Sequence, residues 1–146
     1  MSYPWIVEGT VELCPPVPFA RLRELLDQAA PRGGFEVAPH GSDESELTRL
    51  VNRARWVLVP EADADAGTDD GRDRPRAVKY LRVNDPGIEA HDVDERIRGL
   101  SACMGAAHEF RGRLRYWGDM GGEDGEIVPS REGGAPYWRQ IGGRYW

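Results

Sequence analysis

The sequence has few of the residues on which several classes of protein depend. Only two of the 146 residues are cysteine, Cys14 and Cys103, and their separation matches neither a zinc-binding nor a redox spacing. We expect both to be reduced, small buried hydrophobic residues in a cytoplasmic protein. Long apolar runs are also missing, because no stretch approaches the roughly 20 apolar residues of a membrane span. The first residues lack the pattern of a secretory signal.

Lysine is almost absent. Lys79 is the only one, and arginine supplies the rest of the 19 basic residues, against 25 acidic residues and a net charge of −6. This balance argues against a DNA-binding surface, because phosphate binding needs a local excess of basic side chains. The arginine bias has two explanations. One is the codon usage of a GC-rich genome, and the other is that planar guanidinium groups serve ion pairs and acidic partners.

Motifs for catalysis and cofactor binding are missing as well. The chain has no P-loop, no dinucleotide fingerprint and no recognisable Ser–His–Asp or Cys–His arrangement. An EF-hand counted from Asp63 fails, because Thr68 replaces the required glycine and Arg74 the required glutamate. His91 and His108 flank a predicted helix and are too far apart to share a metal. We therefore expect no cofactor, no metal and no enzyme activity.

Hydrophobic periodicity predicts the elements. Residues 5–13 alternate as in a strand with one buried face, and the prolines of 14–18 are expected to end it. Asp43 and Glu46 have the spacing of a capping box at the start of a short helix. Asp92 is expected to cap a longer helix. The further predictions are strands at 53–61, 77–85, 109–117 and 126–130, a strand or loop at 35–41, and helices at 18–30 and 91–107.

This order of elements predicts an α+β fold of the ferredoxin-like type. It would be a βαββαβ unit with an antiparallel sheet, helices on one face only, and an extra C-terminal hairpin or tail. We expect residues 1–146 to form a single domain. Within it, residues 62–76 would be a mobile acidic loop and residues 130–146 an aromatic C-terminal tail.

Three arginines alternate along the predicted strand 109–117. Arg111, Arg113 and Arg115 would share the open face of the sheet with Glu8 and Glu12 of the first strand, which we expect to lie alongside. Cross-strand ion pairs on this face would then satisfy the arginines. The alternative is that an acidic ligand or partner binds them. RNA is disfavoured, because an RNA-binding sheet shows a row of aromatic side chains, and Tyr80 is the main candidate here.

The C-terminal segment 135–146 contains four aromatic rings. Tyr137, Trp138, Tyr145 and Trp146 either fold back onto the body, where Trp5 and Trp117 could complete a cluster, or form an interface together with Arg139. Folding back would gain roughly 1.5–3 kcal/mol for each buried ring. An interface is the alternative, because Trp, Tyr and Arg dominate binding hot spots.

Two stretches resemble a known family. "GTVELCPPVPFARL" and "FRGRLRYWGDMGGEDGEIV" are similar to the opening and closing parts of an uncharacterised family of small proteins from actinobacteria and their phages. They cover about a quarter of the chain. The family's tryptophan after the acidic turn is missing here, and the aromatic tail is extra. The resemblance implies an α+β domain in a mobile-element setting, and no catalytic residue is transferred.

Three functions follow from the sequence. The first is a non-enzymatic binding or inhibitory accessory protein, such as an inhibitor of host defence, that acts through protein contacts and could form a homodimer. Its candidate surfaces are the sheet face with Tyr80 and the three arginines, or the tail. The second is a protein that binds a small anionic ligand such as a nucleotide. The third is a weak enzyme that uses Asp119, Glu123 or His108.

Overall fold

Strands are the most abundant element of the described structure. The computed structural model describes residues 4–27, 34–61, 77–105, 107–118, 124–129 and 136–141. Its strands are β1 Trp5–Pro18, β2 Glu36–Val37, β3 Trp56–Pro60, β4 Ala77–Ile88, β5 Glu109–Arg111, β6 Leu114–Gly118, β7 Asp124–Val128 and β8 Tyr137–Gln140. Its helices are η1 Phe19–Leu22, which leads directly into α1 Arg23–Asp27, then α2 Glu44–Ala54 and α3 Ala90–Met104.

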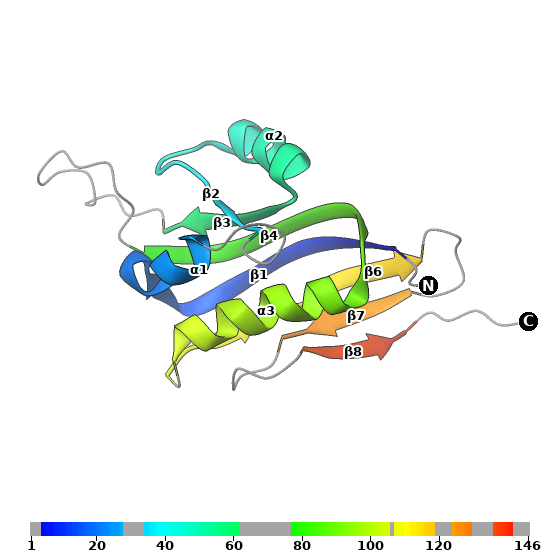
Figure 1. The fold of residues 1–146 in the computed structure, drawn as a ribbon. Coiled ribbons are helices and arrows are strands. Elements are labelled where there is room, and N and C mark those ends of the chain that lie inside the picture. Colours follow the sequence, from blue (N-terminus) through cyan, green and yellow to red (C-terminus); the bar gives the residue numbers. More distant parts are fainter. Residues whose placement is uncertain are drawn as a thin grey trace, which may run out of the picture.

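The described strands form one mixed sheet. Their order is β2-β3-β4-β1-β6-β7-β8, and β5 pairs with β1 (Figure 1). β2 and β3 are parallel, and the other pairs are antiparallel. The predicted ferredoxin-like βαββαβ unit is wrong. The physical reason is that residues 36–37 form a strand parallel to β3, so that α2 becomes the crossover between two parallel strands.

Helices cover both faces of the sheet, whereas the sequence predicted one. Successive residues of β3 show this directly, because side chains alternate along a strand. Trp56 and Leu58 belong to the main core beneath α1 and α3, while Val57 joins Val51 of α2 in a second, smaller cluster. In Figure 1, α3 crosses the middle of the sheet and α2 lies at the β2–β3 side. We call the face that carries α2 the outer face.

β1 confirms the predicted alternation and extends beyond the predicted end. Val7, Val11 and Leu13 are fully buried in the main core, while Glu8 on the outer face is exposed. The prolines do not end the strand. The register with β4 shifts between Glu12 and Val17, and pairing resumes beyond the shift. Proline residues are tolerated at such an irregularity because fewer backbone N–H groups are needed there.

Two further boundaries differ from the sequence predictions. The strand expected at 109–117 is divided into β5 and β6, because Gly112 adopts a φ of 107° that favours glycine. α3 begins at Ala90 after Glu89, so Asp92 lies in its first turn instead of capping it. The capping box of α2 is confirmed, since Asp43 and Glu46 each accept a hydrogen bond from the other's backbone N–H.

Some predictions fall on residues outside the described ranges. The acidic segment 62–76, expected to be a mobile loop, is one of them. Of the aromatic tail 130–146, the described residues are 136–141.

Candidate functional site

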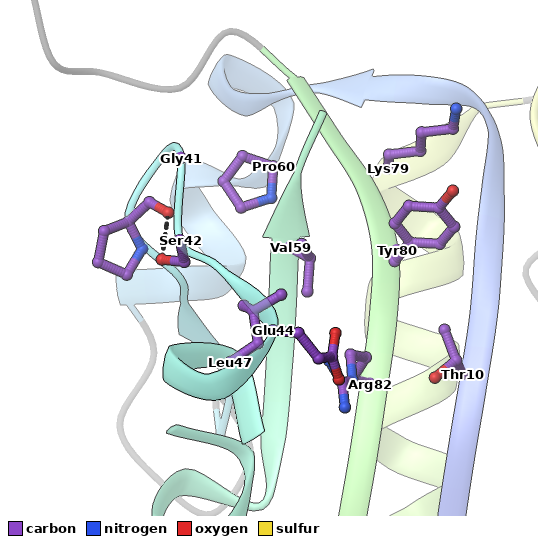
Figure 2. Close-up of a pocket in the computed structure, with 11 residues that line it drawn as sticks. Thr10, Gly41, Ser42, Glu44, Leu47, Val59, Pro60, Lys79, Tyr80 and Arg82 are labelled. Atoms are coloured by element: carbon purple, nitrogen blue, oxygen red, sulfur yellow. Dashed lines mark hydrogen bonds and ion pairs between the residues drawn. The ribbon is translucent and has the colours of Figure 1, made fainter. Parts of the chain in front are cut away.

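A groove lies on the outer face between α2 and β4, and we call it the Tyr80 groove (Figure 2). Its volume is about 510 Å³. One wall comes from the segment before α2 and the start of α2, and the other from β3, β4 and β1. Its lining residues are Thr10, Pro39, Gly41, Ser42, Glu44, Leu47, Val59, Pro60, Lys79, Tyr80 and Arg82.

The floor of the Tyr80 groove is apolar, and its rim carries charge. Leu47 and Val59 are half-buried side chains of the small cluster beneath α2. The Lys79 ammonium lies 5.6 Å from the centroid of the Tyr80 ring, a favourable cation–π distance. Among the described residues, Lys79 has no carboxylate within ion-pair distance, whereas Arg82 pairs with Glu44 at 3.1 Å. Lys79 is therefore a cation of this groove that is open to a ligand.

A second groove of about 450 Å³ adjoins the first. It runs between α2 and the strands β1 and β6, and we call it the arginine groove. Thr10 and Arg82 line both grooves. The other lining residues are Glu8, Gly9, Thr48, Val51, Asn52, Val83, Asn84, Arg113 and Arg115. Together the two grooves run along the side of α2 that borders the sheet.

The arginine stripe lies where the sequence placed it. Arg111, Arg113 and Arg115 are exposed on the outer face. The register confirms their neighbours, since Glu8 lies opposite Arg115 and Glu12 opposite Arg111. The predicted face and the predicted antiparallel pairing with the first strand are therefore both confirmed.

The ion pairs of this stripe differ from those expected. Arg113 binds Glu126 at 2.6 Å, and Arg115 approaches Asp124 at 3.5 Å, both on β7. Arg111 pairs with Glu109 of its own strand at 3.2 Å. The sequence had assigned this role to Glu8 and Glu12, because it did not place β7 beside β6 in register.

Glu126 is the centre of a three-residue charge cluster. Its carboxylate accepts hydrogen bonds from Arg139 of β8 and from Arg113, each at 2.6 Å. The hydrogen bond from Arg139 and the nearby positive charge of Arg113 lower the pKa of Glu126 below its usual range. The same hydrogen bond raises the pKa of Arg139. This cluster ties β8 across β7 to Arg113, the residue just before β6.

The described part of the tail packs back onto the sheet on one side and is exposed on the other. Trp138 contacts Tyr116 and Trp5, with ring centroids 4.8 and 6.2 Å apart. Its indole N–H donates to Asp94 of α3 at 2.7 Å. Tyr137, the next residue towards the N-terminus, is 62% exposed.

Tyr137 and Trp138, the two described rings of the tail, therefore do not pack together. Trp117 stays apart from the rings around Trp5, because it pairs with Ile6 on the outer face and lies 5.7 Å from the Arg115 guanidinium. Tyr145 and Trp146, which were expected to take part, lie outside the described residues.

A group of possible metal ligands lies at the start of α3. Glu89, His91 and Asp92 each offer one ligand atom within 4.8 Å of the others. The two ring nitrogens of His91 approach different carboxylates, Nδ1 at 3.6 Å from Glu89 and Nε2 at 3.2 Å from Asp92. The N-terminal end of a helix also disfavours a cation. Both ring nitrogens of His91 are thus close to carboxylates of the described structure, and we assign no metal to this group.

The residues of the enzyme hypothesis are only partly described. His108 lies between α3 and β5, and its Nδ1 is buried without a hydrogen-bond partner among the described residues. Asp119 and Glu123 lie outside them. The two cysteines are free thiols, and burial, followed by the nearby charge of Glu24, raises the pKa of Cys103.

Comparison of the chain with models of protein families, with curated proteins and with solved structures finds no match. The resemblance to the actinobacterial and phage family stays an expectation. Among the described helices, α3 is the longest at 15 residues, and none is long and apolar enough to cross a membrane.

Sequence reasoning found Tyr80 and the arginine stripe but missed the grooves beside them. The sequence pattern predicts ordinary core positions for Leu47 and Val59. It predicts that Lys79 belongs to a regular strand. The signal that could have revealed the site is the strand at 36–37, because a parallel β2–α2–β3 crossover puts α2 on the outer face.

Proposed function

We propose that this protein is a non-enzymatic binding protein that holds a segment of a partner protein in the Tyr80 groove. The observation that carries the proposal is the combination of an apolar floor, the Tyr80 ring and a cation, Lys79, that has no ion pair in the described structure. A fitting partner segment presents an apolar side chain to Leu47 and Val59 and a carboxylate to Lys79.

The composition of the groove supports a protein partner. Interfaces between proteins are mixed in polarity and enriched in Tyr and Arg, and both occur here next to apolar side chains. A volume near 500 Å³ accommodates a few side chains of a bound peptide segment.

The alternative, an anionic nucleotide gripped by arginines, has less support. Arg82, Arg113 and Arg115 each have a carboxylate partner, at 3.1, 2.6 and 3.5 Å. A phosphate would have to displace Glu44, Glu126 or Asp124 and would face the negative charge of each displaced carboxylate. Such a site attracts a phosphate less than free guanidinium groups would.

The test is a selection from a library of random displayed peptides against the immobilised protein. We expect the selected peptides to combine an apolar residue with a neighbouring Asp or Glu. Binding should weaken about tenfold, equivalent to 1.4 kcal/mol, in Lys79→Gln and in Tyr80→Ala. Arg98→Ala, an exposed position on α3, serves as the matched control and should bind as the wild type does.

Two results would count against the proposal. One is a set of peptides with no acidic residue that bind Lys79→Gln and Tyr80→Ala as tightly as the wild type. The other is saturable binding of ATP that is abolished by Arg113→Ala, which would favour the nucleotide alternative.

A further inference from the structure

Charges of alternating sign form a row across the outer face. Glu8 of β1 lies opposite Arg115 of β6, Arg115 opposite Glu126 of β7, and Glu126 opposite Arg139 of β8. Read across the four strands, the row is negative, positive, negative, positive, and its charges sum to zero. We call it the charged row.

An apolar row lies beside the charged row. Ile6 pairs with Trp117, and Trp117 with Asp124. Ile141 follows β8, and its backbone N–H donates to the Asp124 carbonyl at 2.9 Å. Ile141 is 58% exposed. Both ends of this second row are therefore apolar, with Trp117 and Asp124 between them.

We propose that this face binds a second copy of the chain, sheet against sheet, about a twofold axis that runs parallel to the strands between β6 and β7. Such an axis reverses the order of the strands in the second copy but does not shift residues along the strands. Each row therefore packs against the same row of the second copy. The charged rows of the two copies then lie against each other in opposite order. Glu8 of one copy faces Arg139 of the second copy, and Arg115 of one copy faces Glu126 of the second. In the apolar row, Ile6 faces Ile141. A twofold interface has to be self-complementary in this way.

The twist of the sheets is compatible with this pairing. Packed sheets cross at about 30° and lie about 10 Å apart. With strands about 4.8 Å apart, Glu8 and Arg139 lie roughly 7 Å from the axis, so the crossing angle displaces them by about 4 Å along the strands. Two long side chains can cover that distance.

The position of α2 agrees with the same arrangement. α2 rises from the outer face beyond β1, over β3 and β4. In the dimer, β8 of the second copy lies above β1. Because β8 is the edge strand of the described sheet, no further described strand of that copy lies over β4 and β3, where α2 stands. The edge strand would thus enter the arginine groove, where its exposed Tyr137 and Arg139 would meet Thr10 and Glu8. Among the described residues, Glu8 has no ion pair of its own.

This inference does not depend on the proposed peptide site, because the charged row and the apolar row contain none of the residues that line the Tyr80 groove. Its test is sedimentation equilibrium of the full chain over a range of concentrations at low salt and at high salt. The wild type should form a dimer that salt weakens, because its contacts are exposed ion pairs. Glu8→Arg and Arg139→Glu should each weaken the dimer at least tenfold, equivalent to 1.4 kcal/mol, because each places like charges opposite one another.

An equimolar mixture of the two variants provides the decisive control. In the mixed dimer, Arg at position 8 faces Glu at position 139, and the two unchanged residues also face each other, so association should return to the wild-type level. Circular dichroism of each variant verifies the fold, and Arg98→Glu on α3, across the sheet from the proposed interface, should leave the dimer unchanged. A monomeric wild type, a dimer insensitive to both variants, or a mixture of folded variants that does not associate would each overturn the inference.

Discussion

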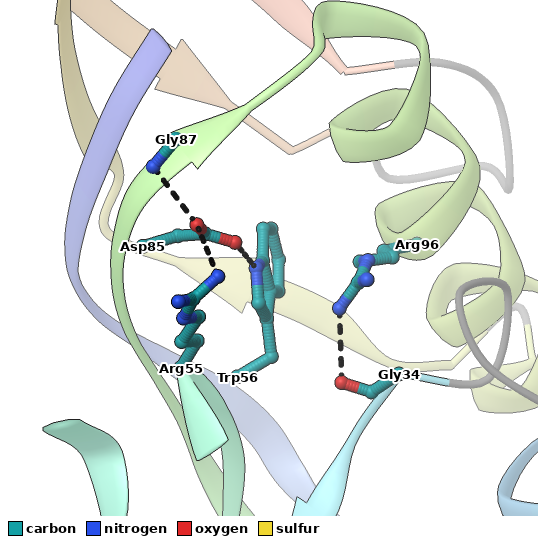
Figure 3. A network of polar contacts seen from close by, with 6 residues as sticks. All are labelled: Gly34, Arg55, Trp56, Asp85, Gly87 and Arg96. Carbon is teal, nitrogen blue, oxygen red and sulfur yellow. Dashed lines mark hydrogen bonds and ion pairs between the residues drawn. The ribbon is translucent and has the colours of Figure 1, made fainter. Parts of the chain in front are cut away.

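Asp85 is a buried carboxylate with three neighbours that compensate its charge (Figure 3). It is 4% exposed and accepts hydrogen bonds from the Trp56 indole at 2.8 Å and from the Gly87 backbone at 3.1 Å. Arg55 approaches it at 3.9 Å. Arg96 lies over the Trp56 ring at 5.2 Å, and burial lowers its pKa while the charge of Asp85 partly restores it.

Replacing Asp85 by Asn should destabilise the protein by about 1–3 kcal/mol. The neutral amide keeps the size of the side chain but leaves the desolvated Arg96 without its main compensating charge and weakens the bond to the indole. Urea denaturation followed by tryptophan fluorescence measures the change. Asp27→Asn, an exposed position at the end of α1, is the control and should stay within about 0.5 kcal/mol of the wild type.

Cys103 should react slowly with thiol reagents near neutral pH. Burial raises its pKa, and Glu24 adds to the effect while Arg21 opposes it. The thiolate is the reactive form. The labelling rate of Cys103 should therefore still rise with pH in the range where the labelling rate of a cysteine in a short peptide no longer changes. The measurement is the pH profile of labelling in Cys14→Ser, which leaves a single thiol. A profile that matches the peptide would contradict the assignment.

At the scale of elements, β8 depends on a glycine in its neighbour. A Cβ at Gly125 would come within 2.8 Å of the Tyr116 ring and would also clash with the backbone carbonyl of Arg139. Backbone cannot move aside as a flexible side chain can. The absence of a side chain at this position lets β8 pair closely with β7 while Tyr116 packs beneath.

Gly125→Ala should therefore detach β8 and lower the free energy of unfolding by about 1–3 kcal/mol. Trp138 would lose its hydrogen bond to Asp94, and its fluorescence should shift towards that of an exposed indole. Gly41→Ala makes a useful comparison, because space is open around Gly41 and its cost comes from a φ of 83° alone. A Gly125→Ala protein with unchanged stability and spectrum would mean that β8 is not anchored as described.

Several elements could be predicted because their patterns are local. The alternation of β1, the capping box of α2 and the helical spacing of the apolar residues in α3 depend on residues a few positions apart. At 35–41 the sequence left a strand or a loop open, since the two residues that form β2 carry no periodicity that would decide between them. The end of β1 was misjudged for a related reason. Proline excludes a regular ladder, but Pro15 and Pro16 lie inside a register shift that only the pairing with β4 reveals.

At the scale of the whole molecule, the two faces of the sheet are covered unequally. The main core joins α1 and α3 to most strands, whereas α2 rests on a small cluster around Val51 and Val57. The candidate site depends on this difference. Tyr80 and the arginines were predictable as residues of an outer face, but the grooves exist because α2 lies on that same face.

This difference predicts that α2 opens before the rest of the fold. Local unfolding needs less free energy where few apolar contacts are broken. Native-state hydrogen exchange should give a smaller free energy of opening for the amides of α2 than for those of α3. Val51→Ala should accelerate exchange in α2 well before it affects α3, and equal opening free energies in both helices would contradict this view.

The single lysine gives the molecule an unusual practical property. Since Lys79 carries the chain's one side-chain ε-amine and lies in the Tyr80 groove, an amine-reactive dye can attach within this groove without any engineered residue. Because this modification removes the Lys79 charge that the proposed partner would bind, the useful readout is protection, in which a ligand in the groove slows the modification of this single ε-amine.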